Sequence, residues 1–536
     1  MKNKVLLFRI LFTIIISLLL YYFLLPPFNL SSPLFWFYAF TIFIIYLASG
    51  VARVIEFKDI ITNRKSLKKA PVSLGISILV LSGFFVLILL INFIQSPLFN
   101  SKAYYNRINI SEDHEFTEDV AQVDFNALPL LDKSSSQKLG DRVMGQMPEL
   151  VSQFDVSDLY TQINFNNSII RVTPLEYNGL IKYFTNRGEG VKGYITVNSV
   201  TGEANLTKLD NGMKYMPSAY FFENLYRKLR LSYPTEIFGN ESFEIDNEGN
   251  PYWIVPTIKY SGIGLREEIT GVIILNPVTG ESTRYKVEDV PTWVDHVYSP
   301  ELIIEQVNDW GLYENGFFNS IFGQKGVVQT TTGYNYTVMN DDVYLYTGIT
   351  SALADEANIG FILTNLRTKE TKFYSVPGAE EYSAMASAEG QVQQMNYQAS
   401  FPLLINLNDK PTYLMSLKDY AGLVKMYALV DVSDYQKVVV TEASLGIEKA
   451  VENYLGDAKL EIDSDKLLNR SINISRINSA NIDGTTIYYI IDEEGNKYKV
   501  NIKVNANYLP FLTSGDTIKI YYKELKEVTE ILNIEK

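Results

Sequence analysis

The stretch "GVIILNPVTGES", residues 271–282, begins as a run of apolar, mostly β-branched residues and stops at Asn276-Pro277. Proline cannot donate a hydrogen bond to a neighbouring strand and Asn favours turns, so the first strand is expected to end there. Gly280 supplies a permissive backbone, and Glu281 restarts the extended chain. No G-x-G-x-x-G opens a helix after a strand, and G-x-x-x-x-G-K-[ST] does not occur, which disfavours a phosphate loop. The stretch therefore predicts a β-hairpin.

The same pattern occurs at three other places in the chain. "GYITVNSVTGEANLTKL" begins at Gly193, "GFILTNLRTKETKFYSV" at Gly360 and "MYALVDVSDYQKVVV" at Met426. A further strand pattern stands upstream of each hairpin, and a helical pattern stands downstream. The repeat predicts four antiparallel sheet-plus-helix units over residues 134–456. One unit alone is too small to bury a core, so neighbouring units are expected to pack together.

Helix-start and helix-stop residues place the helices of these units. Ser218 and Ser299 precede apolar runs as N-caps, Pro300 follows at the first helical position, and Gly456 stands where a C-cap is expected. The predicted helices cover residues 134–154, 218–231, 299–310, 378–395 and 441–456.

The turn of each unit resembles the "V-D-x-x-T-G-E/K" turn of the PepSY domain family. The resemblance is carried by Val197 to Glu203, Leu275 to Glu281 and, more weakly, Thr364 to Glu370 and Val430 to Tyr435. Asn198, Asn276 and Asn365 stand where the family usually has Asp, and Asp431 keeps the Asp but lacks the Thr-Gly. The resemblance implies non-catalytic extracytoplasmic modules, of a family associated with peptidase propeptides and suspected of restraining peptidases.

The last 80 residues, 457–536, have a different pattern. Five alternating strands are expected, and "DEEGNK" (492–497) is typical of a hairpin turn. "LTSGDTIKIYY" (512–522) resembles the turn into a strand of an OB-like or SH3-like small β-barrel. Nucleic-acid binding is opposed by 11 basic against 13 acidic residues in this region.

Three apolar stretches precede residue 99: Val5 to Leu25, Leu34 to Val54 and Val72 to Ile94. Each is close to the ~20 residues that a helix needs to cross a bilayer. The predicted fold class is thus a membrane protein with three N-terminal transmembrane helices in residues 1–99, a polar stalk in 100–133, the α+β repeats and the all-β barrel.

Charge predicts the orientation. Basic residues gather before the first stretch and between the second and third (Lys2, Lys4, Arg9, Arg53, Lys58, Arg64, Lys65, Lys68, Lys69), whereas residues 26–33 carry none. By the positive-inside rule the N-terminus is cytoplasmic and residues after Ile94 are extracellular. That region holds 38 basic and 59 acidic residues and the chain has no Cys, which suits the envelope of a Gram-positive-type bacterium.

Residues that carry chemistry are few. His114 and His296 have neither a second His nor a Cys at metal-ligand spacing, and Asp295-His296 lacks a nucleophile elbow. The loop of residues 322–336 favours a connection over a binding loop. Three pairs of carboxylates could bind Ca²⁺ or serve as a glycosidase acid and base, but a solvated surface is the favoured interpretation; they are Asp341-Asp342, Asp355-Glu356 and Glu380-Glu381. No catalytic, cofactor-binding or metal-binding residue is assigned.

These observations predict a non-enzymatic, membrane-anchored extracellular binding or scaffold protein, with the lipid bilayer and a protein or peptide at the cell envelope as partners. The alternative is a regulator of an extracytoplasmic peptidase or cell-wall enzyme, or a transmitter of signals across the membrane. An envelope hydrolase that uses acidic residues is the third hypothesis. Neither a cofactor nor a nucleic-acid partner is expected.

Overall fold

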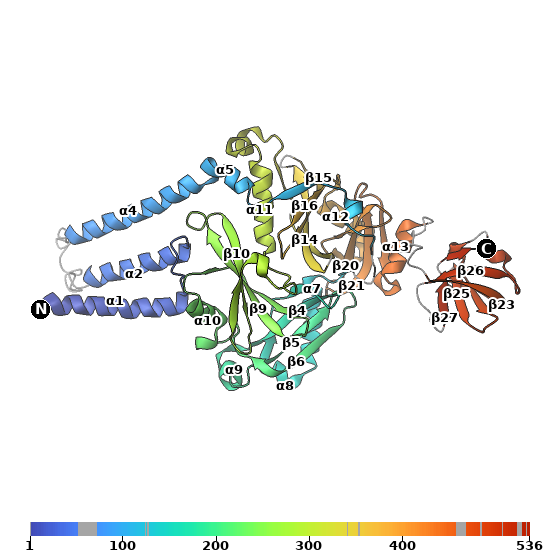
Figure 1. Ribbon diagram of the computed structural model, residues 1–536, viewed down its shortest axis with the longest axis horizontal. Helices are drawn as coiled ribbons and strands as arrows, with labels where there is room; N and C mark the ends of the chain where they lie inside the picture. Colours follow the sequence, from blue (N-terminus) through green and yellow to red (C-terminus); the bar gives the residue numbers. More distant parts are fainter. Residues whose placement is uncertain are drawn as a thin grey trace. The chain divides into compact units, whose positions relative to one another are not determined.

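The computed structural model describes residues 2–51, 72–123, 125, 128–339, 341–351, 354–456, 468–482, 485–505, 508–522, 528–531 and 533–535 (Figure 1). It divides into two compact units, Met1–Ala450 and Val451–Lys536. The basic segment that the orientation depends on, Arg53 to Lys69, lies outside the described residues.

The stretch at residues 271–282 is a hairpin, which confirms the prediction made from its turn residues. Strand β10 (Glu267–Leu275) pairs antiparallel with β11 (Ser282–Tyr285), and Leu275 lies opposite Ser282. The side chain of Asn276 closes the turn, because its Oδ1 accepts hydrogen bonds from the backbone N–H groups of Val278 at 2.9 Å and Thr279 at 3.1 Å. Gly280 takes the left-handed conformation at φ 76°.

The other three turns use the same local bonds. Oδ1 of Asn198 accepts the N–H groups two and three residues later at 2.9 Å, and Asn365 does the same. Asp431 accepts from the N–H of Ser433 at 2.9 Å. Lys369 stands at the position of Gly280 and holds φ 68°, a conformation that costs a non-glycine residue about 1–2 kcal/mol.

The repeated units fold into four sheets with a common strand order, in which two short strands pair with the first long strand and two further strands follow. The first sheet has β2 (Phe154–Val156), β3 (Thr161–Phe165), β4 (Ser168–Tyr177), β5 (Val191–Asn198) and β6 (Ala204–Met213). The second has β7 (Ile237–Phe238), β8 (Ser242–Ile245), β9 (Pro251–Tyr260), β10 and β11. The third has β12 (Val328–Thr330), β13 (Asn335–Met339), β14 (Asp342–Ser351), β15 (Ala354–Asn365), β16 (Thr371–Tyr374) and β17 (Gly378–Ala379). The fourth has β18 (Gln398–Ala399), β19 (Leu403–Asn406), β20 (Pro411–Lys418), β21 (Val424–Asp431) and β22 (Val438–Glu442).

A helix precedes each sheet, and side-chain caps satisfy the first N–H groups of the first three of these helices. The helices are α7 (Lys133–Gly145), α10 (Leu225–Ser232), α11 (Pro300–Tyr313) and α12 (Glu381–Gln391), with α13 (Ile447–Leu455) after the last sheet. Two shorter helices, α8 (Pro148–Val151) and α9 (Gly179–Asn186), belong to the first unit. Ser299 caps α11 through the N–H of Leu302, whereas Ser218 caps no helix because α10 begins later and is capped by Asn224.

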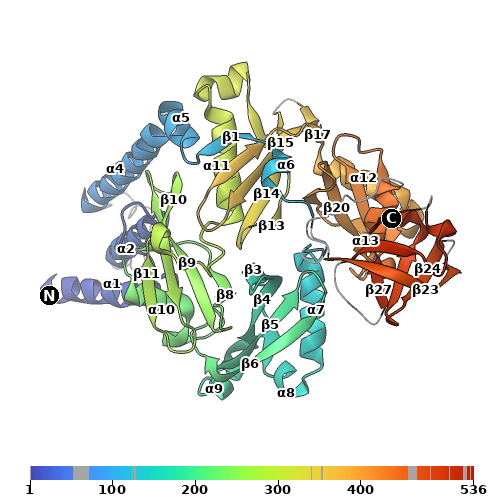
Figure 2. The same cartoon turned by 45° about the vertical axis from the view of Figure 1, so that its right-hand side comes forward.

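Neighbouring sheets share hydrophobic cores, which explains why no unit needs to be stable alone. Alternate residues of β9 enter different cores: Trp253 packs with the first sheet, and Ile254 packs with α11 and the third sheet. In the third sheet, Leu345 faces the second sheet and Tyr346 faces the fourth. In Figure 2, β3, β8 and β13 converge where the first three sheets meet.

Residues 97–132 differ from the polar stalk that was expected. They form α5 (Pro97–Tyr105), β1 (Ile110–His114) and α6 (Phe116–Asp119). β1 joins the third sheet in parallel with β16. Beyond α6, Gln122 bridges to Asn406 of the fourth sheet and Leu131 donates its N–H to the carbonyl of Ser199 in the first. We call residues 106–132 the strap, because it runs across three of the four sheets.

The predicted fold class with three transmembrane helices is wrong. The helices in this region are α1 (Lys2–Leu24), α2 (Pro33–Val51) and α4 (Val72–Gln95). Among the described residues only α1, over Leu6–Leu24, and α4, over Gly75–Gln95, are long and apolar enough to cross a membrane. The apolar part of α2, Pro33–Ser49, has 17 residues, fewer than the ~20 residues that a spanning helix usually has. The rest of the described chain is organised around five β-sheets, so the multi-pass class is not supported.

The C-terminal unit contains β23 (Leu468–Ile482), β24 (Thr485–Asp492), β25 (Lys497–Asn501), β26 (Thr517–Tyr522), β27 (Val528–Ile531) and β28 (Asn533–Glu535). Their order is β27-β25-β24-β23-β26-β28, with β27 parallel to β25. β27 and β28 follow each other along the chain but stand at opposite ends of this order. The sheet therefore curls around one core of twelve buried apolar residues. The long first strand β23 pairs with β26 through its first half and with β24 through its second.

Candidate functional site

The most distinctive site is the junction between the apolar helices and the second sheet unit. Arg230 of α10 donates from Nε to the carbonyl of Leu25 at 2.9 Å, and Arg227 donates from Nη2 to the carbonyl of Tyr22 at 3.2 Å. The last carbonyls of a helix lack partners within the helix and attract positive charge. Two guanidinium groups therefore hold the end of α1 on α10.

Both arginines are also held by aromatic rings. The guanidinium of Arg227 lies 3.8 Å from the ring centre of Tyr22, and that of Arg230 lies 4.4 Å from the ring centre of Phe238. Arg230 is 5% exposed, and burial lowers its pKa to about 10. That pKa is still well above neutral pH, so Arg230 is charged there and its hydrogen bond to the end of α1 is charge-assisted.

The end of α4 is held by the turn between β9 and β10. Asn92 donates from Nδ2 to the carbonyl of Ile263 at 3.0 Å and accepts from its N–H at 2.8 Å. Arg266 donates to Oε1 of Gln95 at 2.9 Å. The same turn reaches the start of α2, where the N–H of Gly264 donates to the carbonyl of Ser31. One sheet unit thus fixes the ends of all three helices.

A further buried arginine ties the strap to α11. Arg107 donates to Glu305 at 2.6 Å, to Asp309, and to the carbonyl of Glu267 at 3.0 Å. Burial alone would lower the pKa of Arg107, but the hydrogen bonds to the two carboxylates outweigh it and raise that pKa.

A polar cluster fills the place where the first three sheets meet, and it contains His296. The ring Nε2 of His296 lies 2.7 Å from the carbonyl of Gln162, so it is assigned as the donor. Glu244, fully buried, accepts from the backbone N–H of Asp295 at 2.8 Å and of His296 at 3.2 Å. Asp295 accepts from the N–H of Asn164 at 2.8 Å. Burial and the charge of Glu244 raise the pKa of Asp295 well above its usual range.

This cluster joins the sheets, and because Nε2 of His296 donates to a backbone carbonyl, that nitrogen is not placed to accept a proton from a nucleophile. Its members come from β3, β8 and the segment before α11, and Asp295 is 2% exposed. The interpretation of His296 as a structural residue fits these contacts.

The other candidate residues are dispersed. His114 lies in the strap, with Nδ1 2.9 Å from Asp119 and Nε2 2.9 Å from the hydroxyl of Ser111. Asp342 accepts two hydrogen bonds from Arg367, both at 2.7 Å, while its neighbour Asp341 is exposed. The side chains of Asp355 and Glu356 lie outside the described residues.

Glu381 contradicts the expectation of a solvated carboxylate. It is fully buried beside the third and fourth sheets, where Asn358 donates to its Oε2 at 3.2 Å. Burial raises the pKa of Glu381. The tight packing of α12 on β20 and β21 explains its position, which the first-turn pattern of a helix could not show.

Residues 322–336 hold β12 and the start of β13, so much of the predicted loop is part of the third sheet. Over the described part of the chain, no group of three or more His, Cys, Asp or Glu residues is arranged to hold a metal ion. The junction arginines escaped the sequence analysis, although "LYRKLR" places Arg227 and Arg230 one helical turn apart on one face.

Comparisons with known proteins give little. No family model and no curated protein matches the chain. Among solved structures the chain is similar to the crystal structure of an ACO/RPE65 chimera in a monoclinic form, at 8% sequence identity and a TM-score of 0.13. The match covers 70% of this chain and 64% of that chain, less than two thirds of its length. A TM-score this low carries no argument about fold or activity.

Proposed function

We propose that this protein is a non-catalytic binding or scaffold protein, held at a membrane by its apolar helices α1 and α4 and exposing its sheets at the outer face of a bacterial envelope. The junction at Arg227, Arg230 and Asn92 is the observation that carries the proposal. At this junction, charged and amide side chains bind the ends of the apolar helices to the second sheet unit, so the sheets stay attached to the helices that anchor the chain. The ends of α1 and α4 both lie at the second sheet unit, so the two helices run in the same direction and the chain between them returns to the N-terminal side. With that arrangement, the basic N-terminus and the excess of acidic residues after Ile94 support an outward orientation of the sheets.

The partner on the outer side is proposed to be a protein or peptide. The four sheets share a strand order and have turns closed by Asn in three units and by Asp431 in the fourth, which supports a PepSY-like family. β1 already adds a strand to an edge of the third sheet. Edge pairing of this kind is a general mode of peptide recognition. These features also favour the second candidate, a regulator that restrains an extracytoplasmic peptidase or cell-wall enzyme.

Protease added to intact cells tests the orientation. We expect cleavage within the sheet region while a tag at the N-terminus stays protected, and cleavage only after lysis would overturn the proposal. Copurification of a peptidase with the full chain from solubilised membranes would favour the regulator. Turnover of an envelope substrate that is lost on changing one carboxylate would revive the hydrolase.

A further inference from the structure

An exposed apolar patch lies beside the junction, on α9 and on the 3₁₀ turn η3 (Phe221–Glu223). It consists of five large apolar side chains, which rarely lie together on a surface that faces water. They are Leu180, Ile181, Phe184, Phe221 and Phe222, and their exposed fractions are 45%, 76%, 50%, 44% and 68%. We call these five residues the α9 patch. Contiguous apolar surface of this kind marks an interaction site.

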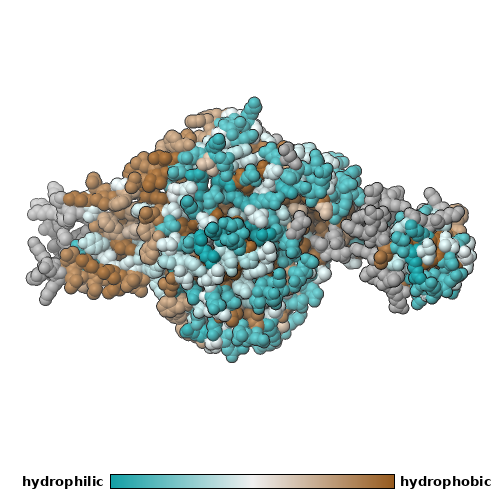
Figure 3. All heavy atoms as spheres, viewed as in Figure 1, coloured by the Kyte–Doolittle hydropathy of each residue, from teal (hydrophilic) through white to brown (hydrophobic). Residues whose placement is uncertain are grey.

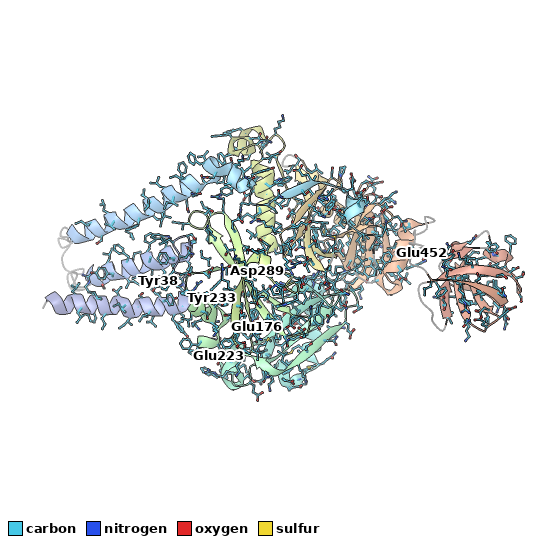
Figure 4. The ribbon with its side chains drawn as sticks, in the orientation of Figure 1. Tyr38, Glu176, Glu223, Tyr233, Asp289 and Glu452 are labelled. Carbon is cyan, nitrogen blue, oxygen red and sulfur yellow. The ribbon has the colours of Figure 1, made fainter. Side chains whose placement is uncertain are left out.

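Buried contacts between α9 and the 3₁₀ turn hold the patch in place. Tyr183, fully buried under α9, donates its hydroxyl to Glu223 at 2.7 Å, and Arg187 pairs with the same carboxylate at 3.1 Å. Figure 4 labels Glu223, which contacts α9 through Tyr183. The rings of Phe184 and Phe221 lie 5.8 Å apart. The two segments therefore present their apolar side chains as one surface.

Phe221 holds a strained backbone. Its φ is 54°, which is rare for an aromatic residue and costs about 1–3 kcal/mol. Strain of this size persists where the surroundings impose it, and here it turns the Phe221-Phe222 pair outward instead of into the core.

The patch is continuous with α1. Arg227 donates to the carbonyl of Phe221 and, through its other nitrogen, to that of Tyr22, and its guanidinium covers the Tyr22 ring. Phe23 at the same end of α1 is 73% exposed. In Figure 3 the apolar colouring continues from the helices onto the adjoining part of the sheet region, and hydrophilic colouring dominates the rest of that visible face.

We propose that the α9 patch lies in the interface of the lipid bilayer, with its five apolar side chains at the boundary between headgroups and acyl chains beside the end of α1. Phe and Leu side chains on the apolar face of an interfacial helix are buried to this depth. The inference rests on the proposed anchoring by α1 and α4. A second copy of the chain or a hydrophobic peptide would also bury such a patch, but neither accounts for its continuity with the lipid-facing residues of α1.

The chain has no cysteine, so single cysteines can carry an environment-sensitive fluorophore on the full-length protein. Three variants suffice: Ile181→Cys in the patch, Leu18→Cys in α1 and Tyr420→Cys, a fully exposed residue of the fourth sheet unit. Each is placed in vesicles of phosphatidylcholine and phosphatidylglycerol, with nitroxide-labelled lipids as quenchers at shallow or deep positions.

We expect the label at 181 to shift to shorter emission wavelengths and to be quenched most by the shallow nitroxide. The label at 18 should be quenched most by the deep nitroxide, and the label at 420 should stay in water. An aqueous label at 181 together with a lipid-quenched label at 18 overturns the inference and leaves the anchoring intact. A shifted label at 181 that no lipid quenches shows that protein covers the patch, which also overturns it. An aqueous label at 18 refutes the anchoring itself.

Discussion

The side-chain oxygen of Asn276 lies 2.9 Å from the backbone nitrogen of Val278, and this bond closes the hairpin at residues 271–282. Replacing Asn276 by Ala removes this bond and the bond to Thr279. We expect the free energy of unfolding to fall by about 1–2 kcal/mol. Asn276→Asp keeps an acceptor, as Asp431 does in the fourth turn, and should change stability less. Urea unfolding followed by circular dichroism compares the two variants, and equal losses would show that the side chain does not close the turn.

Two equivalent turn glycines differ in their surroundings. Gly202 and Gly280 both hold φ 76°, but a Cβ on Gly280 would lie 2.3 Å from a carbon of the Tyr215 ring, whereas a Cβ on Gly202 meets its nearest atom at 3.5 Å. Gly202→Ala should cost about 1–2 kcal/mol from backbone strain. Gly280→Ala should cost about 1–3 kcal/mol more, because the ring must move. Thermal unfolding of the two variants side by side measures the difference, and similar losses would contradict the close contact.

Asp295 should make stability depend on pH. Its folded pKa is raised, chiefly by burial and then by Glu244, so between about pH 4, its unfolded pKa, and the folded value the folded chain binds more protons. The contribution of Asp295 is therefore most favourable below about pH 4 and falls as pH rises, by up to about 1.4 kcal/mol per pH unit. Asp295→Asn should flatten this slope. Denaturant midpoints of both proteins from pH 4 to 8 give the answer, and parallel curves would contradict a raised pKa.

Arg107 should hold the strap in place. Arg107→Met leaves Asp309 and Glu305 without their cation and should destabilise the region by about 3–5 kcal/mol. Arg107→Lys should be intermediate, because an ammonium cannot reproduce the planar set of bonds. The readout is the rate at which a protease cuts within residues 106–132. Unchanged cleavage in the Met variant would show that β1 pairing alone secures the strap.

Local turn chemistry made the hairpins predictable, since Asn276, Gly280 and their counterparts act within six residues. Hydropathy failed for α2 because it reports composition and cannot show where a helix begins, and the apolar part of α2 in the described chain has 17 residues. The strap was missed because "ISEDH" has no alternating pattern, and its strand exists only through pairing with β16. The junction depends on contacts between residues 205 positions apart, such as Arg230 with Leu25, which no local pattern contains.

Extraction of membranes with alkaline carbonate tests the central claim most directly, because it strips peripheral proteins and leaves helices that cross the bilayer. We expect the full chain to stay in the membrane pellet. A chain with Arg in place of Ile15 and Leu87 should be released more readily, since each charge near a helix centre costs about 2.5–3.5 kcal/mol in the bilayer. Release of the unaltered chain into the supernatant would contradict anchoring by α1 and α4.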